Sequence, residues 1–550
     1  MRPRPTSGTP RRTLQSPLYP PAYLPLYLPL YLPLAGLLAA CAGPAPKGAR
    51  GAGADSGAPE ASEPTRSTLP DVMDIDRLLA HLDALDALSA ASARSRVLGS
   101  AAFDQSADYV QGALEGAGYS VQRVPFTHGV WSETGPGVLA VGGLSDLAAG
   151  VDYQNFGRSP PGRATGQLLP VDIQLPPPGG TNSTDSGCQA RDWDDFEPGA
   201  LALLQRGGCS FSEKLAMAEA AGAAGVILFN EGQADRRGLV EGQLDDVLAH
   251  SVPVLDATTA VAEALLERMA VGPLTVTIEA QVAVERFPTV NLLADLPGQT
   301  ADLVVIGAHL DSVAAGPGIN DNGSGTATVL ELALQAAALR AAGEPDPRDT
   351  LRFAFWGAEE EGLIGSFAYV RGLDELALAA HVANLNFDML ASPNGLRAVY
   401  DGDGDARLGG AEAPAGSAVL EALFTDHFEA RDLDWSPTAF DGRSDYGPFI
   451  LAGVPAGGLF SGAEVDKSAH EALIYGGAAG EPLDACYHRA CDGVENIDPV
   501  LLLEMAEAAA AATAGAADLA PFVADRARSA PPRHHDLPYV GGCDGARPAR

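Results

Sequence analysis

The stretch that decides the fold is LRFAFWGAEEEGLIGS, residues 351–366. Its first six residues are mostly apolar and predict a buried strand, and the chain then runs directly into Glu359, Glu360 and Glu361. A solvated run of charge is the ordinary explanation for an acidic triplet. The other possibility is that positive charge faces these carboxylates, and the rest of the chain has to supply it.

Strand-like and helix-like segments alternate around this stretch. Apolar runs that predict strands occur at 303–308, 381–387 and 454–460, and a helical pattern fills 326–343. Strands that alternate with helices predict a largely parallel sheet covered on both faces. We therefore expect an α/β fold with a mostly parallel mixed sheet flanked by helices.

Chain length, composition and net charge limit the possible domain organisation and partners. A chain of 550 residues, 46% of them apolar, can form two or more domains with sizeable cores. Its 71 acidic and 35 basic residues give a formal net charge of −36. Because so acidic a chain repels phosphate groups, we expect no nucleic-acid partner.

The N-terminus has the features of an export signal. Arginines at the start precede an apolar segment that ends in LAGLLAAC, residues 34–41, which is similar to a bacterial lipobox. We expect residues 1–41 to be a lipoprotein signal peptide with Cys41 lipidated, and the protein to be a cell-envelope lipoprotein (periplasmic or on the outer surface) or secreted. A Pro-rich low-complexity tract is the alternative interpretation of residues 23–34.

Changes in composition predict the domain boundaries. The expected segments are a flexible linker at 42–68, a first part of the α/β domain at 69–126, an inserted domain at 127–288, a second, catalytic part at 289–520 and a C-terminal tail at 521–550. After the signal, no stretch approaches the about 20 apolar residues that span a bilayer, so the lipid is the only membrane contact expected.

Five cysteines remain once Cys41 is assigned to lipid. Export makes disulfides the default state. Neighbourhood favours pairing Cys188 with Cys209 and Cys486 with Cys491, which leaves Cys543 in the tail, although sequence alone does not fix this connectivity. Zinc–thiolate sites are not expected, because no CxxC pair occurs.

Polar residues follow the predicted strands where each one ends. His309 and Asp311 follow the first strand, the three glutamates follow the second, and Asp388 follows the third. Asp321 lies in a Gly-rich loop that opens a helix, and His488 lies in the segment CYHRAC. Ligands of open α/β sheets bind at this carboxyl edge.

Each of these residues alone would be weak evidence of function, because an isolated His is usually structural and an Asp before Gly usually forms a turn. Together they are more informative. Carboxylates crowded at one edge repel each other, which raises their pKa, and a divalent cation removes that conflict. Histidine with Asp and Glu but without thiolate suits a catalytic zinc site.

These segments also carry a family resemblance. The motifs GAHLDS, GINDNGSGTATVLELA, FWGAEEEGLIGS, LNFDM, GRSDYGPF and CYHRACD resemble the co-catalytic di-zinc aminopeptidase family, especially secreted bacterial enzymes that favour large apolar N-terminal residues. The match runs from about residue 71 to 515 apart from the insertion, with the motifs in family order. It implies a zinc-peptidase, phosphorylase/hydrolase-like α/β fold with two Zn²⁺ per chain.

The resemblance implies a ligand role for five residues. His309 and Asp388 would hold one zinc, Glu360 and His488 the other, and Asp321 would bridge both.

It also implies roles around the metals. Glu359 matches the general base, Asp311 a carboxylate that orients the His309 imidazole, and Tyr487 a tyrosine that stabilises the oxyanion, while Arg443 would position substrate. Glu361 receives no role. A shift of one residue, with Glu360 as base and Glu361 as ligand, is the main ambiguity.

The insertion resembles a second family. Residues 187–232 are similar to the protease-associated domain, with Cys188 and Cys209 in the positions of its disulfide, and a lid or substrate-access role is a hypothesis. Within the peptidase, Cys486 and Cys491 match a disulfide that pins the His488 loop.

The resemblance implies a monomeric, exported exopeptidase that removes large apolar residues from peptides with a free N-terminus. Two zinc ions about 3.5–4 Å apart would share a water, and Glu359 would move its proton to the leaving amine. The alternatives are a carboxypeptidase or dipeptidase on the same scaffold, a glutaminyl cyclase, or a non-catalytic binding or receptor module.

One acidic loop has a different interpretation. In DGDGDARLGGAE, residues 401–412, the spacing of Asp401, Asp403, Asp405 and Glu412 is similar to that of a calcium loop. However, Ala406 stands where such loops need Gly, and no entering helix is evident. We expect a solvated loop at a strand end.

Overall fold

The computed structural model describes residues 68–519 except positions 145, 235 and 241. The expected signal peptide, the tail at 521–550, Cys41 and Cys543 lie outside the described residues, as does the linker apart from Thr68.

One sheet has eight strands in the order β1-β9-β11-β10-β12-β15-β13-β14. The strands are β1 Val121–Glu133, β9 Val282–Leu296, β10 Leu303–His309, β11 Thr350–Trp356, β12 His381–Phe387, β13 Ala398–Tyr400, β14 Ser436–Thr438 and β15 Ala456–Phe460. β11, β10, β12 and β15 run parallel, whereas β9 pairs antiparallel with β11. The expected mostly parallel mixed sheet is confirmed.

Both faces of this sheet are covered, which explains why its central strands are almost continuously apolar. Val304 and Ile306 of β10 pack into the larger core with the long helices, while Val305 packs into a second core on the other face. Every residue of β12 is buried.

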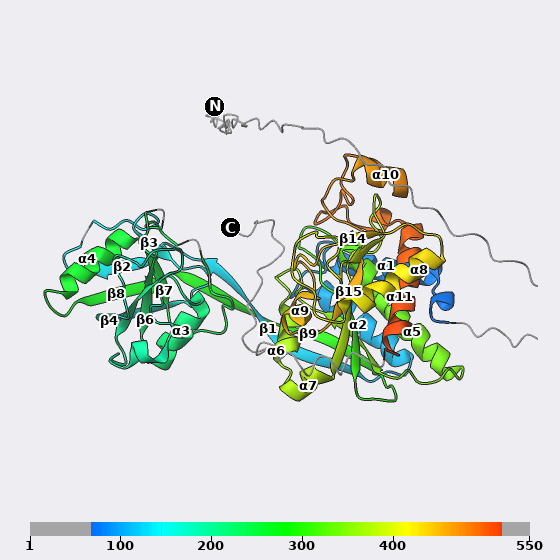
Figure 1. Ribbon diagram of the computed structural model, residues 1–550, viewed down its shortest axis with the longest axis horizontal. Coiled ribbons are helices and arrows are strands. Elements are labelled where there is room, and N and C mark those ends of the chain that lie inside the picture. Colours follow the sequence, from blue (N-terminus) through cyan, green and yellow to red (C-terminus); the bar gives the residue numbers. More distant parts are fainter. Residues whose placement is uncertain (1–67, 145, 235, 241, 520–550) are drawn as a thin grey trace, which may run out of the picture. The chain divides into compact units, whose positions relative to one another are not determined.

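The helices around the sheet are α1 Ile75–Ser89, α2 Ala101–Gly116, α5 Gly325–Ala341, α6 Ile364–Arg371, α7 Glu375–Ala380, α8 Ser417–Ala430, α9 Gly447–Leu451, α10 Ala469–Tyr475 and α11 Pro499–Ala516. α1 (blue) and α11 (red), from opposite ends of the described chain, contact each other (Figure 1). Each begins at an aspartate, Asp74 or Asp498, whose carboxylate accepts backbone N–H groups of the first turn.

Helix α11 is long and apolar enough to cross a membrane by length and composition, which the sequence alone did not bring out. More than half of this helix is buried in the fold. Leu502, Met505 and Ala509 are fully covered within the larger core, so burial accounts for its apolar character.

The insertion forms a second sheet of seven strands in the order β2-β8-β4-β5-β6-β7-β3. These are β2 Val138–Val141, β3 Tyr153–Asn155, β4 Gly162–Pro170, β5 Leu201–Gln205, β6 Gly225–Phe229, β7 Val254–Ala257 and β8 Thr275–Ala280, with helices α3 Phe211–Ala220 and α4 Thr259–Met269. The insertion is β-rich, as expected. The boundaries expected at 126/127 and 288/289 fall within β1 and β9, which pair along their length.

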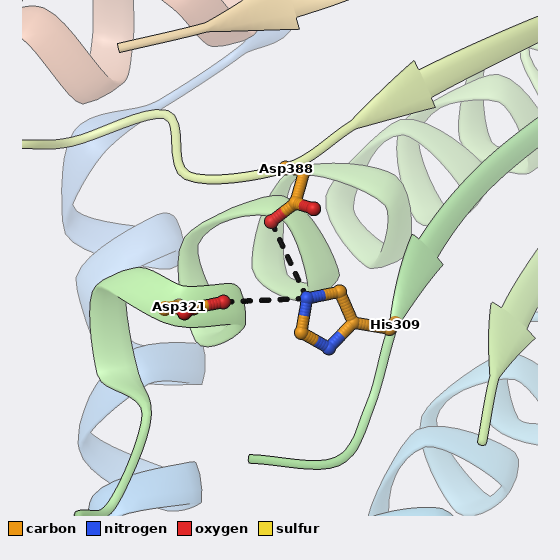
Figure 2. A group of neighbouring side chains, drawn as sticks. All are labelled: His309, Asp321 and Asp388. Carbon is orange, nitrogen blue, oxygen red and sulfur yellow. Dashed lines mark hydrogen bonds and ion pairs between the residues drawn. The ribbon is translucent and has the colours of Figure 1, made fainter. Parts of the chain in front are cut away.

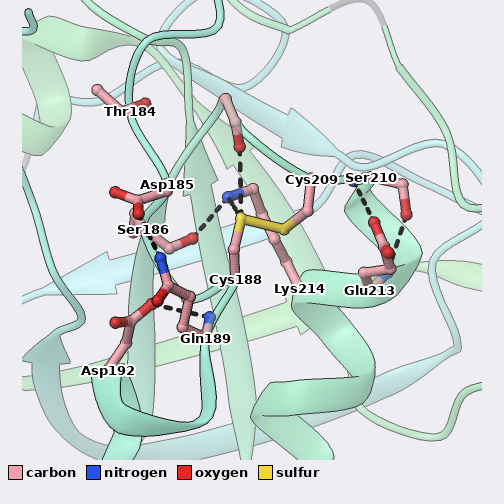
Figure 3. Close-up of a disulfide and its surroundings, with 12 residues drawn as sticks. Thr184, Asp185, Ser186, Cys188, Gln189, Asp192, Cys209, Ser210, Glu213 and Lys214 are labelled. Carbon is pink, nitrogen blue, oxygen red and sulfur yellow. Dashed lines mark hydrogen bonds between the residues drawn. A yellow bond between two sulfur atoms is a disulfide. The ribbon is translucent and has the colours of Figure 1, made fainter.

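Two disulfides are present, Cys188–Cys209 and Cys486–Cys491, as expected. Beside the first, the buried ammonium of Lys214 donates to the carbonyl oxygen of Ser186 (2.5 Å) and lies 3.3 Å from Cys188 Sγ (Figure 3). Burial lowers the pKa of Lys214 to about 8. The disulfide and this lysine together tie the segment before β5 to α3.

Two leucines provide a matched test of this core. Leu385 in β12 is 0% exposed and Leu376 in α7 is 83% exposed. We expect Leu385→Ala to lower the free energy of unfolding by about 2–5 kcal/mol, because it leaves a cavity, and Leu376→Ala to change it by less than about 0.5 kcal/mol. Urea denaturation measures both, and equal losses would contradict the assigned burial.

Candidate metal centre

Three neighbouring parallel strands bring the candidate ligands to one edge of the sheet. β10 ends at His309, β11 leads into Glu359 and Glu360, and β12 leads into Asp388. Because β10 lies between β11 and β12, their carboxyl ends adjoin. Asp321 lies in the short π-helical turn η4 Ile319–Ser324, directly before α5, and its own backbone dihedrals are not helical.

The first group consists of His309, Asp321 and Asp388, all buried. His309 Nε2 lies 3.3 Å from Asp321 Oδ1 and 3.3 Å from Asp388 Oδ1, so both carboxylates point at the same ring nitrogen (Figure 2). The three side chains come from three separate segments of the chain and converge on one point.

The second group consists of Asp321, Glu360 and His488. His488 Nε2 lies 3.0 Å from Glu360 Oε2 and 3.2 Å from Asp321 Oδ2. Asp321 therefore turns one carboxylate oxygen to each group. The structure thus brings together all five residues expected as ligands, with Asp321 between the two histidines.

The electrostatics of the two groups favour a cation. Burial raises the pKa of Glu360 to about 8 and that of Glu359 well above its ordinary value. Burial alone would lower the pKa of His488, but its hydrogen bonds to Asp321 and Glu360 outweigh this and raise the pKa to about 10. In the absence of a metal ion, these carboxylates are therefore stabilised by protons, either on the carboxylates themselves or on the neighbouring imidazoles.

The donor atoms fit zinc. Each group offers imidazole nitrogen and carboxylate oxygen atoms that all lie within 4.8 Å of one another. Imidazole and carboxylate without thiolate are the ligands of catalytic zinc sites.

The turn after β11 directs the side chains of Glu359, Glu360 and Glu361 to different places. The backbone N–H groups of Glu359 and Glu360 donate to the two carboxylate oxygens of Asp311, at 3.1 and 3.3 Å. Glu359 Oε2 then lies 3.8 Å from His309 Nε2, while Glu360 faces His488. The Glu361 side chain is 40% exposed and belongs to neither group.

Asp311 contacts His309 mainly through its backbone. His309 Nδ1 lies 3.2 Å from the carbonyl oxygen of Asp311 and 3.8 Å from its carboxylate. The carboxylate instead holds the glutamate turn, so Asp311 connects the turn to the imidazole.

Tyr487 and Arg443 line the same pocket as the ligands. Arg443 Nη2 donates to Tyr487 Oη (2.9 Å), and Nη1 pairs with Glu464 (2.9 Å). The Tyr487 ring stacks on His488 with centroids 3.9 Å apart. The rest of the wall consists of Met389, Tyr400, Thr438, Ala439, Asp441, Ser444, Phe460 and Ala463, most of them apolar or weakly polar.

Some supporting residues received no role from the sequence. Ser444 donates to Asp388 Oδ2 (2.5 Å), and Asp492 accepts the backbone N–H of Asp321 (3.1 Å). Asp445 is fully buried, which raises its pKa to about 7. All three lie in the motifs GRSDYGPF and CYHRACD. Their place in these motifs, near a proposed ligand or substrate-positioning residue, is the sequence feature that could have indicated a role for them.

The acidic loop at 401–412 differs in part from expectation. Asp403, Asp405 and Glu412 are exposed, but Asp401 is buried and accepts the N–H of Gly404 (2.8 Å). The residue that approaches Asp401 and Asp403 is Glu421 of α8, which accepts the N–H groups of residues 402 and 403.

Comparison with known proteins shows the family. Residues 291–513 match Peptidase family M28, and residues 164–265 match the PA domain. An aminopeptidase of Pseudomonas aeruginosa is 40% identical over 409 residues, which cover 74% of each chain. The probable lipoprotein aminopeptidase LpqL of Mycobacterium tuberculosis is 40% identical over 465 residues, 82% of this chain and 88% of the relative.

Leucine aminopeptidase 2 of Arthroderma otae is 37% identical over 407 residues, 74% of this chain and 76% of the relative. The chain therefore belongs to peptidase family M28 and is a hydrolase of peptide bonds that carries an inserted PA domain.

The two adjacent glutamates allow a direct test of the ligand register. We expect Glu360→Gln to lose the cation beside His488, because the amide oxygen carries no charge. Glu361→Gln, one residue away and exposed, should keep the full metal content. Elemental analysis after dialysis measures both; the reverse pattern would assign the ligand to Glu361.

Proposed function

We propose that the protein is an exported zinc aminopeptidase that removes large apolar N-terminal residues from peptides, with Glu359 as general base. The observation that carries this proposal is the pair of donor groups that share Asp321, with Glu359 beside them. The names of the relatives, aminopeptidase and leucine aminopeptidase, support the same substrate class.

Two zinc ions per chain fit the donor set. His309 and Asp388 would hold one and Glu360 and His488 the other, with Asp321 shared. Such a pair, when bound, polarises a carbonyl and lowers the pKa of water toward neutrality.

Glu359 moves the proton. Its carboxylate is 2% exposed, and burial raises its pKa, which strengthens it as a proton acceptor. It takes a proton from the attacking water and returns it to the leaving nitrogen. Tyr487 donates a hydrogen bond to the carbonyl oxygen as negative charge develops there.

The pocket accounts for the choice of substrate end. Its wall contains the carboxylates of Asp321, Glu359, Glu360 and Asp388, which attract a protonated α-amino group. Tyr400 and Phe460 offer apolar surface to the first side chain. A carboxypeptidase would need a cation such as Arg443 to bind the C-terminal carboxylate of its substrate. The ion pair between Arg443 and Glu464 already offsets that charge, which disfavours this alternative.

The proposal also covers export, the lipid anchor, the oligomeric state and the inserted domain. The similarity to a lipoprotein aminopeptidase supports export with lipid on Cys41, and the two disulfides also support export. That the chain is monomeric stays a prediction. The inserted PA domain would control access of peptides to the pocket.

A panel of substrates tests the end specificity. We expect hydrolysis of leucyl p-nitroanilide and of peptides with a free N-terminus, and loss of at least about 100-fold in kcat/KM when the amino group is acetylated, since a charge contact is removed. Equal cleavage of the acetylated substrates would contradict an aminopeptidase.

Glu359→Gln tests the general base. The amide cannot accept a proton, so we expect kcat to fall by about 10²–10⁴-fold while the zinc content stays unchanged. Glu361→Gln is the matched control and should retain activity. Full activity of the Glu359 variant would assign the base to another residue.

A further inference from the structure

A buried arginine contacts the segment that joins two of the candidate metal ligands. Arg96 precedes α2 and is 0% exposed. Its Nε donates to the carbonyl oxygen of Pro317 (2.9 Å) and its Nη2 to that of Gly318 (2.5 Å), while Nη1 donates to the carbonyl oxygen of Leu310. All three partners are backbone groups more than 200 residues away along the chain.

A buried guanidinium normally has a carboxylate partner, because an unpaired buried charge is costly. Among the described residues, no carboxylate forms an ion pair with Arg96. Its charge is offset at longer range by Asp311, Asp321, Glu360 and Asp492, the acidic groups in and around the metal centre.

The carbonyl partners lie at the two ends of one connection, residues 310–318, between β10 and the turn that carries Asp321. Leu310 directly follows His309, and Gly318 lies three residues before Asp321. The backbone N–H of Arg96 also donates to Ser312 Oγ (2.9 Å). One arginine therefore binds both ends of the connection between His309 and Asp321, whose nearest ring nitrogen and carboxylate oxygen are 3.3 Å apart.

We propose that Arg96 is a positioning residue for the metal centre: its guanidinium fixes both ends of the connection 310–318, which holds His309 and Asp321 at the spacing that a cation needs. This inference rests on the proposed zinc function. Two effects of Arg96 oppose each other, because its positive charge repels a cation while its hydrogen bonds order the ligands. Because the guanidinium makes three hydrogen bonds to this segment, we expect its ordering of the ligands to outweigh its repulsion of the cation.

Because the charge and the hydrogen bonds of Arg96 change zinc affinity in opposite directions, the direction of the change in a variant shows which effect is larger. Arg96→Met removes both the charge and the hydrogen bonds, and Arg96→Lys keeps the charge but lacks the planar fork that reaches three carbonyls. Arg94→Met is the matched control, since Arg94 is 60% exposed and pairs with Asp86. Zinc affinity is measured by competition with a chelator at 25 °C, after circular dichroism shows that each variant is folded.

We expect zinc affinity to fall by about 10–100-fold in Arg96→Met, as for other groups that orient metal ligands, less in Arg96→Lys, and by under about 2-fold in Arg94→Met. Unchanged or tighter binding by Arg96→Met overturns the inference while leaving the proposed function intact. Should that variant not fold, an unchanged affinity of Arg96→Lys overturns it. Absence of zinc from the wild-type protein instead overturns the proposed function, and this inference with it.

Discussion

The constraint on which this structure depends is the repulsion among carboxylates buried at one edge of a sheet. Asp321, Glu359, Glu360 and Asp388 each lie within 4 Å of the His309 or His488 imidazole and are largely shielded from water. Water cannot screen their charges there, so the fold has to provide positive charge or leave the acids protonated. Two imidazoles provide some of it, and a pair of divalent cations would provide the rest.

The topology makes this crowding possible. Adjacent parallel strands end at the same edge, and each continues into a turn that carries one or two ligands. Further contacts hold these segments: Asp311 accepts from the glutamate turn, and Arg96 binds both ends of the connection between His309 and Asp321. The ligand edge is thus held in place by residues from before and after the insertion.

Much of this could be predicted from sequence, because the strands are apolar runs, His309, Glu360 and Asp388 lie at or just after strand ends, and Asp321 and His488 lie in motifs that resemble the family's. Contacts between distant segments could not be predicted, since no local pattern records them: Arg96 meets Leu310 across 214 positions. The full length of the β1–β9 pair was also missed, because composition changes before the strands end. Asp401 was expected in solvent, but its backbone partner at Gly404 allows it to be buried.

We propose that five side chains hold two cations with Asp321 between them. Anomalous diffraction at the zinc absorption edge, on crystals of the wild-type protein grown with zinc, locates such cations. We expect two anomalous peaks, one beside His309 and Asp388 and one beside Glu360 and His488, with Asp321 touching both. A single peak, or peaks elsewhere with this pocket vacant, would rule out the shared site.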